Sequence, residues 1–149
     1  MFTILRTNSD NTDFHLLVHE LDAELKIRDG EDHDFYAPYN KLEAIKHVVL
    51  VMDNSIPVGC GALKKFSDDT MEVKRMFVPL NYRSKGIASM VLKELEKWAG
   101  ELNYTKCILE TGEKQPEAIG LYKKHRYSII PNYGQYANVK TSICFMKEL

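Results

Sequence analysis

Residues 71–88 read MEVKRMFVPLNYRSKGIA, a stretch that joins a strand, a basic turn and the start of a helix. Met71–Val78 has the alternation that is typical of a strand, and Ile87–Leu102 carries apolar residues at helical spacing. Between them, Arg83–Ala88 forms a basic turn that contains a glycine. The first N–H groups of a helix, together with its dipole, favour an anion. This arrangement predicts a binding site for a pyrophosphate.

Two common nucleotide-binding motifs do not fit this turn. Neither G-x-G-x-x-G nor G-x-x-x-x-G-K-[ST] can be aligned with its residues. The turn has the pattern R-x-x-G-x-A over Arg83–Ala88 instead. With its flanking strand and helix, this pattern resembles the coenzyme A loop of the GNAT superfamily of N-acetyltransferases, which reads Q/R-x-x-G-x-G/A. The resemblance implies that acetyl-CoA is the cosubstrate.

The resemblance also implies which residues contact the coenzyme. Main-chain groups of Met76 and Val78 would bond the pantetheine arm like an added strand, while Arg83–Ala88 would surround the pyrophosphate. Gln115 stands where many relatives carry an asparagine that contacts the same arm. The implied coenzyme-binding residues are Met76, Phe77, Val78, Arg83, Ser84, Lys85, Gly86, Ile87, Ala88 and Gln115. The alternative for the turn is a glycine helix cap with solvated basic side chains.

The rest of the chain predicts an alternation of strands and helices. A helix with an apolar stripe follows the first strand and ends near Lys26, and the aromatic segment Phe35–Asn40 suits a short helix. A last helix starts at Pro116, where proline needs no N–H. Besides Met71–Val78, the expected strands are Phe2–Leu5, His47–Met52, Val58–Phe66, Cys107–Leu109, Tyr127–Ile130 and Ser142–Met146.

This order predicts a mixed α/β (α+β) domain with a mostly antiparallel sheet of about seven strands and about four flanking helices. It is also the order of the GNAT fold, and the resemblance covers Leu5–Leu149. Its best-matched part is Glu72–Tyr127. The chain of 149 residues suits a single domain over 1–149.

Composition limits the partners. Lysine and arginine total 20 against 21 acidic residues, a balance that leaves no charge footprint for nucleic acid or an anionic membrane. The chain also has no secretory signal or bilayer-spanning apolar stretch. Three cysteines in apolar runs predict a reducing, cytoplasmic location, and five scattered histidines without a CxxC pair predict no metal site.

Glu72 is the candidate general base. Alternation from Met71 to Val78 would place Glu72, Lys74, Met76 and Val78 on one face of the strand. In GNAT enzymes that use a glutamate base on this strand, it lies eleven positions before the loop's Q/R, and Glu72 lies eleven before Arg83. The alternative is a strand-end glutamate paired with Lys74 or Lys106.

Tyr122 is the candidate general acid. It ends the run Ala118-Ile119-Gly120-Leu121-Tyr122, which is similar to the family's A-i-x-L-Y helix, where the tyrosine hydroxyl faces the coenzyme sulfur. A phenol keeps its proton at neutral pH and can give it to a nearby thiolate. The alternative is a core tyrosine whose hydroxyl reaches the surface.

One residue departs from the family pattern. Relatives usually have glycine before the aromatic that follows the tyrosine helix, whereas this chain has Arg126-Tyr127. If that position needs a left-handed backbone, an arginine there costs about 1 kcal/mol.

The acceptor pocket should lie across the sheet from the coenzyme, with Tyr36, Tyr39, Asn40, Glu110, Tyr133 and Tyr136 as its lining. The expected function is acetyl transfer from acetyl-CoA to a primary amine of a small molecule, by direct attack in a ternary complex. A route through Cys107 or Cys144 is not expected, since neither has a nearby histidine in sequence. The alternatives are a protein-lysine acetyltransferase and a non-catalytic acetyl-CoA sensor. A homodimer would fit the family, in which dimers are common.

Overall fold

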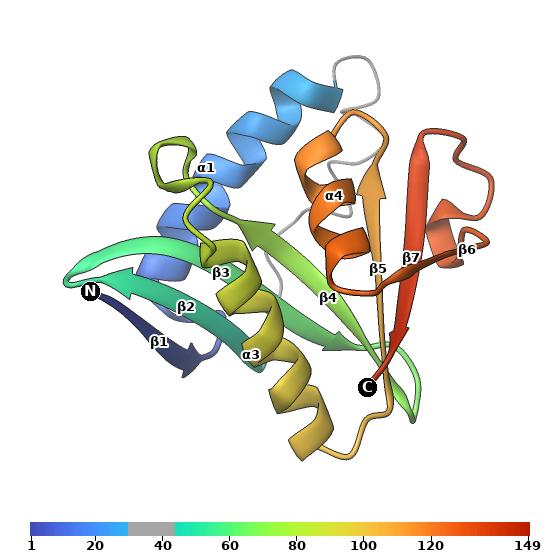
Figure 1. Cartoon of the computed structure of the whole chain (residues 1–149), viewed down its shortest axis with the longest axis horizontal. Coiled ribbons are helices and arrows are strands. Elements are labelled where there is room, and N and C mark those ends of the chain that lie inside the picture. Colours follow the sequence, from blue (N-terminus) through green and yellow to red (C-terminus); the bar gives the residue numbers. More distant parts are fainter. Residues whose placement is uncertain (30–43) are drawn as a thin grey trace.

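The structure is a computed structural model that describes residues 1–29 and 44–149, with only the backbone of Asp29 (Figure 1). Its helices are α1 (Thr12–Asp29), α3 (Ile87–Glu101) and α4 (Pro116–Lys124), with short 3-10 turns at Leu80–Tyr82 and Gly134–Tyr136. Its strands are β1 (Phe2–Thr7), β2 (His47–Asp53), β3 (Ile56–Lys65), β4 (Thr70–Phe77), β5 (Lys106–Gly112), β6 (Ser128–Ile130) and β7 (Ser142–Glu148). Among the described helices, none is long and apolar enough to cross a membrane.

The strands form one sheet in the order β1-β2-β3-β4-β5-β7-β6. All neighbours are antiparallel except β4 and β5, which run parallel. The expected mixed, mostly antiparallel sheet of seven strands is therefore confirmed. The described residues include three α-helices, and the expected short helix over Phe35–Asn40 lies outside them.

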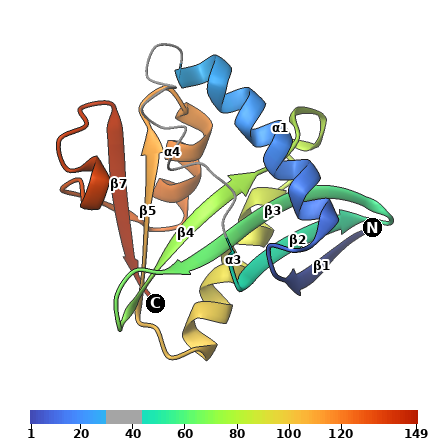
Figure 2. The ribbon, with the colours of Figure 1, turned by 180° about the vertical axis from the view of Figure 1, so that it is seen from behind.

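Helices cover both faces of this sheet. Helix α1 lies on one face, and α3 and α4 lie on the other (Figures 1 and 2). On the α1 face, Phe14 and Leu17 pack with Leu50, Cys60 and Phe77.

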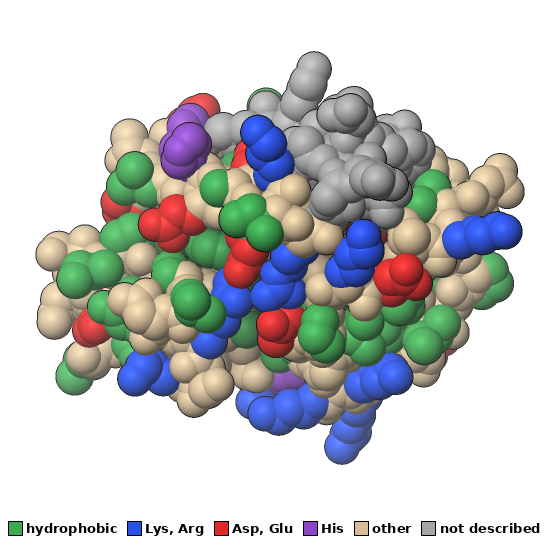
Figure 3. All heavy atoms as spheres, turned by 90° about the horizontal axis from the view of Figure 1, so that it is seen from above, with side chains coloured by type: hydrophobic (Ala, Val, Ile, Leu, Met, Phe, Trp, Pro, Cys, Tyr) green, Lys and Arg blue, Asp and Glu red, His purple; other side chains and the backbone are tan. Residues whose placement is uncertain are grey.

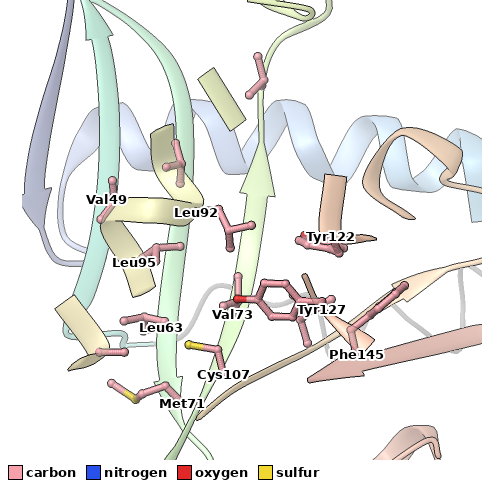
Figure 4. Close-up of a cluster of buried hydrophobic side chains, with 14 of the residues drawn as sticks. Val49, Leu63, Met71, Val73, Leu92, Leu95, Cys107, Tyr122, Tyr127 and Phe145 are labelled. Atoms are coloured by element: carbon pink, nitrogen blue, oxygen red, sulfur yellow. The ribbon is translucent and has the colours of Figure 1, made fainter. Parts of the chain in front are cut away.

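A larger cluster fills the opposite face, beneath α3 and α4. There, Leu92 and Leu95 of α3 pack against Val49 and Leu63, and Phe145 reaches Tyr122 of α4 (Figure 4). These two cores explain why the sheet's central strands are apolar on both sides.

Several elements are longer than the sequence pattern predicts, and α1 and β5 are two of them. Helix α1 continues past Lys26 to Asp29, and β5 extends from the expected Cys107–Leu109 to Lys106–Gly112. The extra length of β5 is stabilised by pairing with β7, which matches it residue for residue. Such tertiary pairing overrides the weak local signal of short polar segments.

A β-bulge in β4 changes which side chains share a face. Cys60 pairs with Phe77 and Ala62 with Lys74, so two residues of β4 oppose the single Gly61 of β3. Arg75, inside the bulge, has a φ of 59°. A bulge of this kind shifts the alternation by one residue.

The expected alternation along β4 is therefore wrong beyond the bulge. Met76 and Val78 pack on the α3 face with Val73, whereas Phe77 packs on the α1 face. The grouping of Glu72 with Met76 and Val78 on one face does not hold, because it assumed an unbroken strand. Main-chain groups of β4 and the Glu72 side chain can nevertheless serve the same cleft.

The parallel strands β4 and β5 part along their length. Their register joins Thr70 to Lys106, Met71 to Cys107 and Glu72 to Ile108, and it ends there. Past Glu72 the two strands diverge (Figure 1). Diverging strands leave backbone N–H and C=O groups along the inner edge of β4 available to an extended ligand.

Arg126 occupies the position where a glycine was expected from related sequences. Its φ is 69°, so the left-handed conformation is confirmed at this residue. The Tyr127 N–H that follows donates to the Tyr122 carbonyl at the end of α4. A left-handed arginine therefore ends helix α4, despite the conformational cost of this backbone for a residue other than glycine.

Gly61 lets α3 approach the sheet closely, which gives a test of the packing. A Cβ at this position would lie 2.6 Å from Met76 Sδ and 2.7 Å from Val91 Cγ1. We expect Gly61→Ala to lower the free energy of unfolding by about 1–3 kcal/mol through overpacking, measured by urea denaturation. The matched control is Gly100→Ala, because a Cβ there meets nothing within 4 Å. Equal stability of the two variants would contradict this account.

Candidate active site

A cleft of about 410 Å³ opens where β4 and β5 diverge. Strands β4 and β5, helices α1 and α4, and the turn before α3 all contribute to its walls. Sequence-predicted residues that line it are Glu72, Met76, Phe77, Val78, Arg83, Ser84, Gly86, Ile87, Ala88, Glu110, Gln115, Tyr122 and Tyr136. Lys85 and Tyr133 are described but do not line it, and Tyr36, Tyr39 and Asn40 lie outside the described residues.

The turn at one end of the cleft is shaped for an anion. Ser84 has a φ of 64° and Gly86 a φ of 81°, so the backbone is left-handed at two positions just before α3 begins. The first turn of α3 contains no acidic residue. Its N–H groups, free of intrahelical acceptors, therefore face a site without a competing carboxylate in that turn.

Arg83 is already engaged by protein groups. Its Nε donates to the Val78 carbonyl at 2.8 Å, and its Nη2 lies 2.7 and 2.9 Å from the two carboxylate oxygens of Glu24 on α1. The sequence predicted Arg83 as a phosphate-binding residue but did not reveal this partner, which is 59 positions away. Arg83 thus joins the turn to α1.

A second arginine continues this connection to α4. Arg28 makes two hydrogen bonds to the Glu117 carboxylate, at 2.8 and 2.9 Å, and lies 3.6 Å from Glu24. We call Arg83, Glu24, Arg28 and Glu117 the ion-pair chain. Basic and acidic side chains lie interspersed over the end of the molecule that Figure 3 shows. The i,i+4 spacing of Glu24 and Arg28 is the one sequence signal that could have revealed part of this chain.

Glu117 gives a pH test of the ion-pair chain. Hydrogen bonds from Arg28 and from its own backbone N–H lower the pKa of Glu117 from 4.5 to about 2. A lowered pKa contributes stability above the ordinary value, and this contribution is lost as the pH falls through the folded value. Since the pair is partly exposed, we expect Glu117→Gln to cost under about 1 kcal/mol at pH 7.

That difference should shrink below pH 4.5 and vanish near pH 2, as followed by urea denaturation across this range. Glu113→Gln, a change of an exposed glutamate just before α4, is the control. A difference between wild type and Glu117→Gln that stays constant down to about pH 2 would contradict the assignment.

Glu72 is buried on the α1 face of β4, with 8% of its surface exposed. Its Oε2 accepts a hydrogen bond of 2.7 Å from the Tyr133 hydroxyl, and its Oε1 lies 4.0 Å from Lys74 Nζ. Lys106, the other partner considered from sequence, lies near Asp69 instead. Of the alternative predicted from the sequence, the pairing with Lys74 is present as an ion pair, whereas Glu72 is buried and not solvated. The tyrosine partner, 61 residues away, was missed by sequence reasoning.

Tyr122 lies in the wall of the same cleft and is 5% exposed. Its ring packs against Tyr127 and Phe145, with centroid separations of 5.8 Å to each. Burial, and then the nearby charge of Glu110, raise the pKa of the Tyr122 phenol. This side chain therefore holds its proton at neutral pH, as a proton donor must.

The acceptor side of the cleft contains Glu110 and Tyr136. Glu110 accepts a hydrogen bond of 2.6 Å from the Ser142 hydroxyl on β7. Tyr136 packs perpendicular to Tyr133, at a centroid distance of 5.9 Å. Together they form a polar and aromatic wall beside Glu72.

The cysteines do not suit nucleophilic catalysis. All three are buried and none is in a disulfide. Burial raises the pKa of Cys107 to about 12 and also raises the pKa of Cys144. A thiol is reactive as its thiolate, so these side chains are inert at neutral pH.

The mixed sheet with diverging parallel strands, and the basic turn at the mouth of the resulting cleft, give this chain an acyltransferase-like fold. Residues 14–127 match the model of the acetyltransferase (GNAT) family. The chain belongs to this family.

Particular relatives agree with this assignment. An uncharacterized N-acetyltransferase of Bacillus subtilis, YjcF, is 31% identical over 91 residues, which cover 61% of this chain. The match covers 62% of that relative, so the chain spans about three fifths of its length.

Two solved structures share the fold over nearly their whole length. A Klebsiella pneumoniae protein assigned as an acyl-CoA N-acyltransferase has a TM-score of 0.82 at 23% identity, covering 100% of this chain and 98% of that one. A GNAT family acetyltransferase of Elizabethkingia anophelis, solved with acetyl-CoA bound, has a TM-score of 0.70 at 21% identity, covering 99% and 98%.

Proposed function

We propose that this protein transfers an acetyl group from acetyl-CoA to a primary amine of a small molecule. The observation that carries the proposal is the cleft between β4 and β5, because one space is lined by the anion-binding turn, Glu72 and Tyr122. Family membership and the acetyl-CoA in a structural neighbour support the choice of coenzyme. The reaction would take place in the cytoplasm, as expected from the buried, unpaired cysteines.

The residues present fit the coenzyme. The inner edge of β4 would bond the pantetheine through Met76 and Val78, as an added strand does. The turn from Arg83 to Ala88 would hold the pyrophosphate with its backbone N–H groups, and Gln115 would contact the arm from the start of α4. Arg83 would contribute its charge by exchanging its contact with Glu24 for one with the pyrophosphate.

The chemistry needs a base and an acid on the two sides of the thioester. Glu72 would take a proton from the ammonium, and the amine nitrogen would then attack the thioester carbonyl carbon. A C–N bond forms and the C–S bond breaks, with the electron pair leaving on sulfur. The Tyr122 hydroxyl would protonate this thiolate. The second proton that the nitrogen loses as the amide forms would pass through water to restore the Tyr122 hydroxyl, and Glu72 would release its proton to solvent. Because the cysteines are buried thiols, direct attack is preferred over an acyl-enzyme.

The loop that carries Tyr133 favours a small acceptor. Tyr136 lines the cleft that contains Glu72 and is backed by Tyr133, whereas a protein-lysine acetyltransferase would need an open groove. Glu110 adds a carboxylate that suits a cationic amine. A panel of amino acids, polyamines, aminosugars, aryl amines and lysine peptides, assayed by release of free coenzyme A, tests this class directly.

Two substitutions test the catalytic roles. We expect Glu72→Gln and Tyr122→Phe each to lower kcat by about 10²–10⁴-fold, the usual contribution of one general acid or base. Acetyl-CoA should bind both variants with unchanged Kd, as measured by calorimetry. A normal kcat for Glu72→Gln would remove Glu72 from the base role.

A third substitution separates catalysis from coenzyme sensing. Arg83→Ala should raise the Kd for acetyl-CoA by about tenfold, since a charge-assisted contact is lost, and leave the kcat at saturation within a few-fold of wild type. A sensor would instead keep its function in Glu72→Gln and Tyr122→Phe and lose it in Arg83→Ala. Coenzyme binding that is unaffected by Arg83→Ala would show that the turn backbone alone holds the phosphates.

A further inference from the structure

The hydrogen bond between Tyr133 and Glu72 joins the loop that connects β6 and β7 to the centre of β4. The sequence suggested Tyr133 as a lining residue for the acceptor, yet its side chain is absent from the cleft wall. Its hydroxyl is placed 2.7 Å from Glu72 Oε2 instead. Because Tyr133 contacts the candidate base, its role differs from the acceptor-lining role that the sequence suggested.

Tyr133 is held firmly in this position. Its ring lies between Phe66, at a centroid distance of 5.2 Å, and Tyr136, at 5.9 Å, in edge-on contacts with both. The side-chain amide of Asn132 donates to the Val139 and Ser142 carbonyls, at 2.9 and 3.0 Å, and so closes the loop on itself. Restricted side chains of this kind hold their partners in one geometry.

The direction of the hydrogen bond is fixed by chemistry. Burial, and then the charge of Glu72, raise the pKa of the Tyr133 phenol, so this hydroxyl keeps its proton and donates it. A buried carboxylate requires such a donor if it is to stay ionised. Tyr133 cannot itself be the base, because its phenol is already protonated and cannot accept the proton of the amine.

We propose that Tyr133 positions the Glu72 carboxylate, binding Oε2 so that Oε1 is the oxygen that receives the proton of the amine. The proposal rests on the proposed function, in which Glu72 is the base. Oε1 lies 4.0 Å from Lys74 Nζ, beyond hydrogen-bond distance. Tyr133 is thus a positioning residue that acts through Glu72.

Other titratable groups lie near this carboxylate. Lys74 lies on its own strand and Lys64 is its register partner on β3, while Tyr136 and Cys144 face it from the loop and from β7. Burial raises the pKa of Tyr136 and of Cys144, so both remain neutral at neutral pH. Tyr133 donates its hydroxyl hydrogen to the Glu72 carboxylate.

Tyr133→Phe tests the proposal, since it keeps the ring and removes the hydroxyl. The first measurement is the kcat and KM of this variant on the full chain, with its Kd for acetyl-CoA and its urea denaturation measured beside them. Without the donor the carboxylate is no longer held in one orientation, so we expect kcat to fall about tenfold while the Kd for acetyl-CoA stays unchanged.

Tyr127→Phe is the matched control. Tyr127 also donates from a buried phenol to a glutamate, with 2.9 Å to Glu96 Oε2, but it lies outside the cleft wall. We expect this variant to lose stability without lowering kcat. An equal fall of kcat in both variants would assign the effect to a general loss of packing and overturn the proposal.

The outcomes separate this proposal from the proposed function. An unchanged kcat in Tyr133→Phe, with Glu72→Gln inactive, overturns the positioning role and leaves the base intact. Full activity in Glu72→Gln overturns the base and the positioning role together. A lower kcat in Tyr133→Phe that comes with a weaker Kd for acetyl-CoA also overturns the proposal, because the damage would then extend beyond the Glu72 carboxylate.

Discussion

The end of the parallel pairing between β4 and β5 is the constraint on which the rest of the structure depends. Three residue pairs, from Thr70–Lys106 to Glu72–Ile108, join the strands before they part. If β4 and β5 stayed paired along their whole length, their mutual hydrogen bonds would occupy the inner edge of β4, and no cleft would form between them. The bulge at Arg75 lies three residues beyond Glu72, and bulges of this kind increase the local twist of a strand.

The opening also arranges the candidate catalytic groups. Glu72 lies at the last paired position of β4, and Tyr122 enters the cleft from α4 on the opposite face of the sheet. A ligand threaded between the strands would meet the base on one side and the acid on the other. The anion-binding turn follows β4 directly, so one continuous stretch of chain supplies the edge, the turn and the helix N-terminus.

Much of this arrangement could be predicted because its signals are local. The glycine turn, the strand before it, the tyrosine helix and the left-handed Arg126 are each encoded within a few residues. The bulge could not be predicted, since Arg75 gives no glycine signal and a regular alternation fits the same letters. Contacts such as Tyr133 to Glu72 and Arg83 to Glu24 join residues about 60 positions apart, and only the folded chain brings them together.

The ion-pair chain affects how strongly the cleft attracts an anionic ligand. Arg83 is neutralised by Glu24 before any phosphate arrives, and Arg28 is likewise shared between Glu24 and Glu117. Under the proposed function, a pyrophosphate would exchange places with a carboxylate rather than fill an empty cationic site. Long-range attraction for an anionic ligand would then be weak, and selection would come from short-range contacts with the turn backbone.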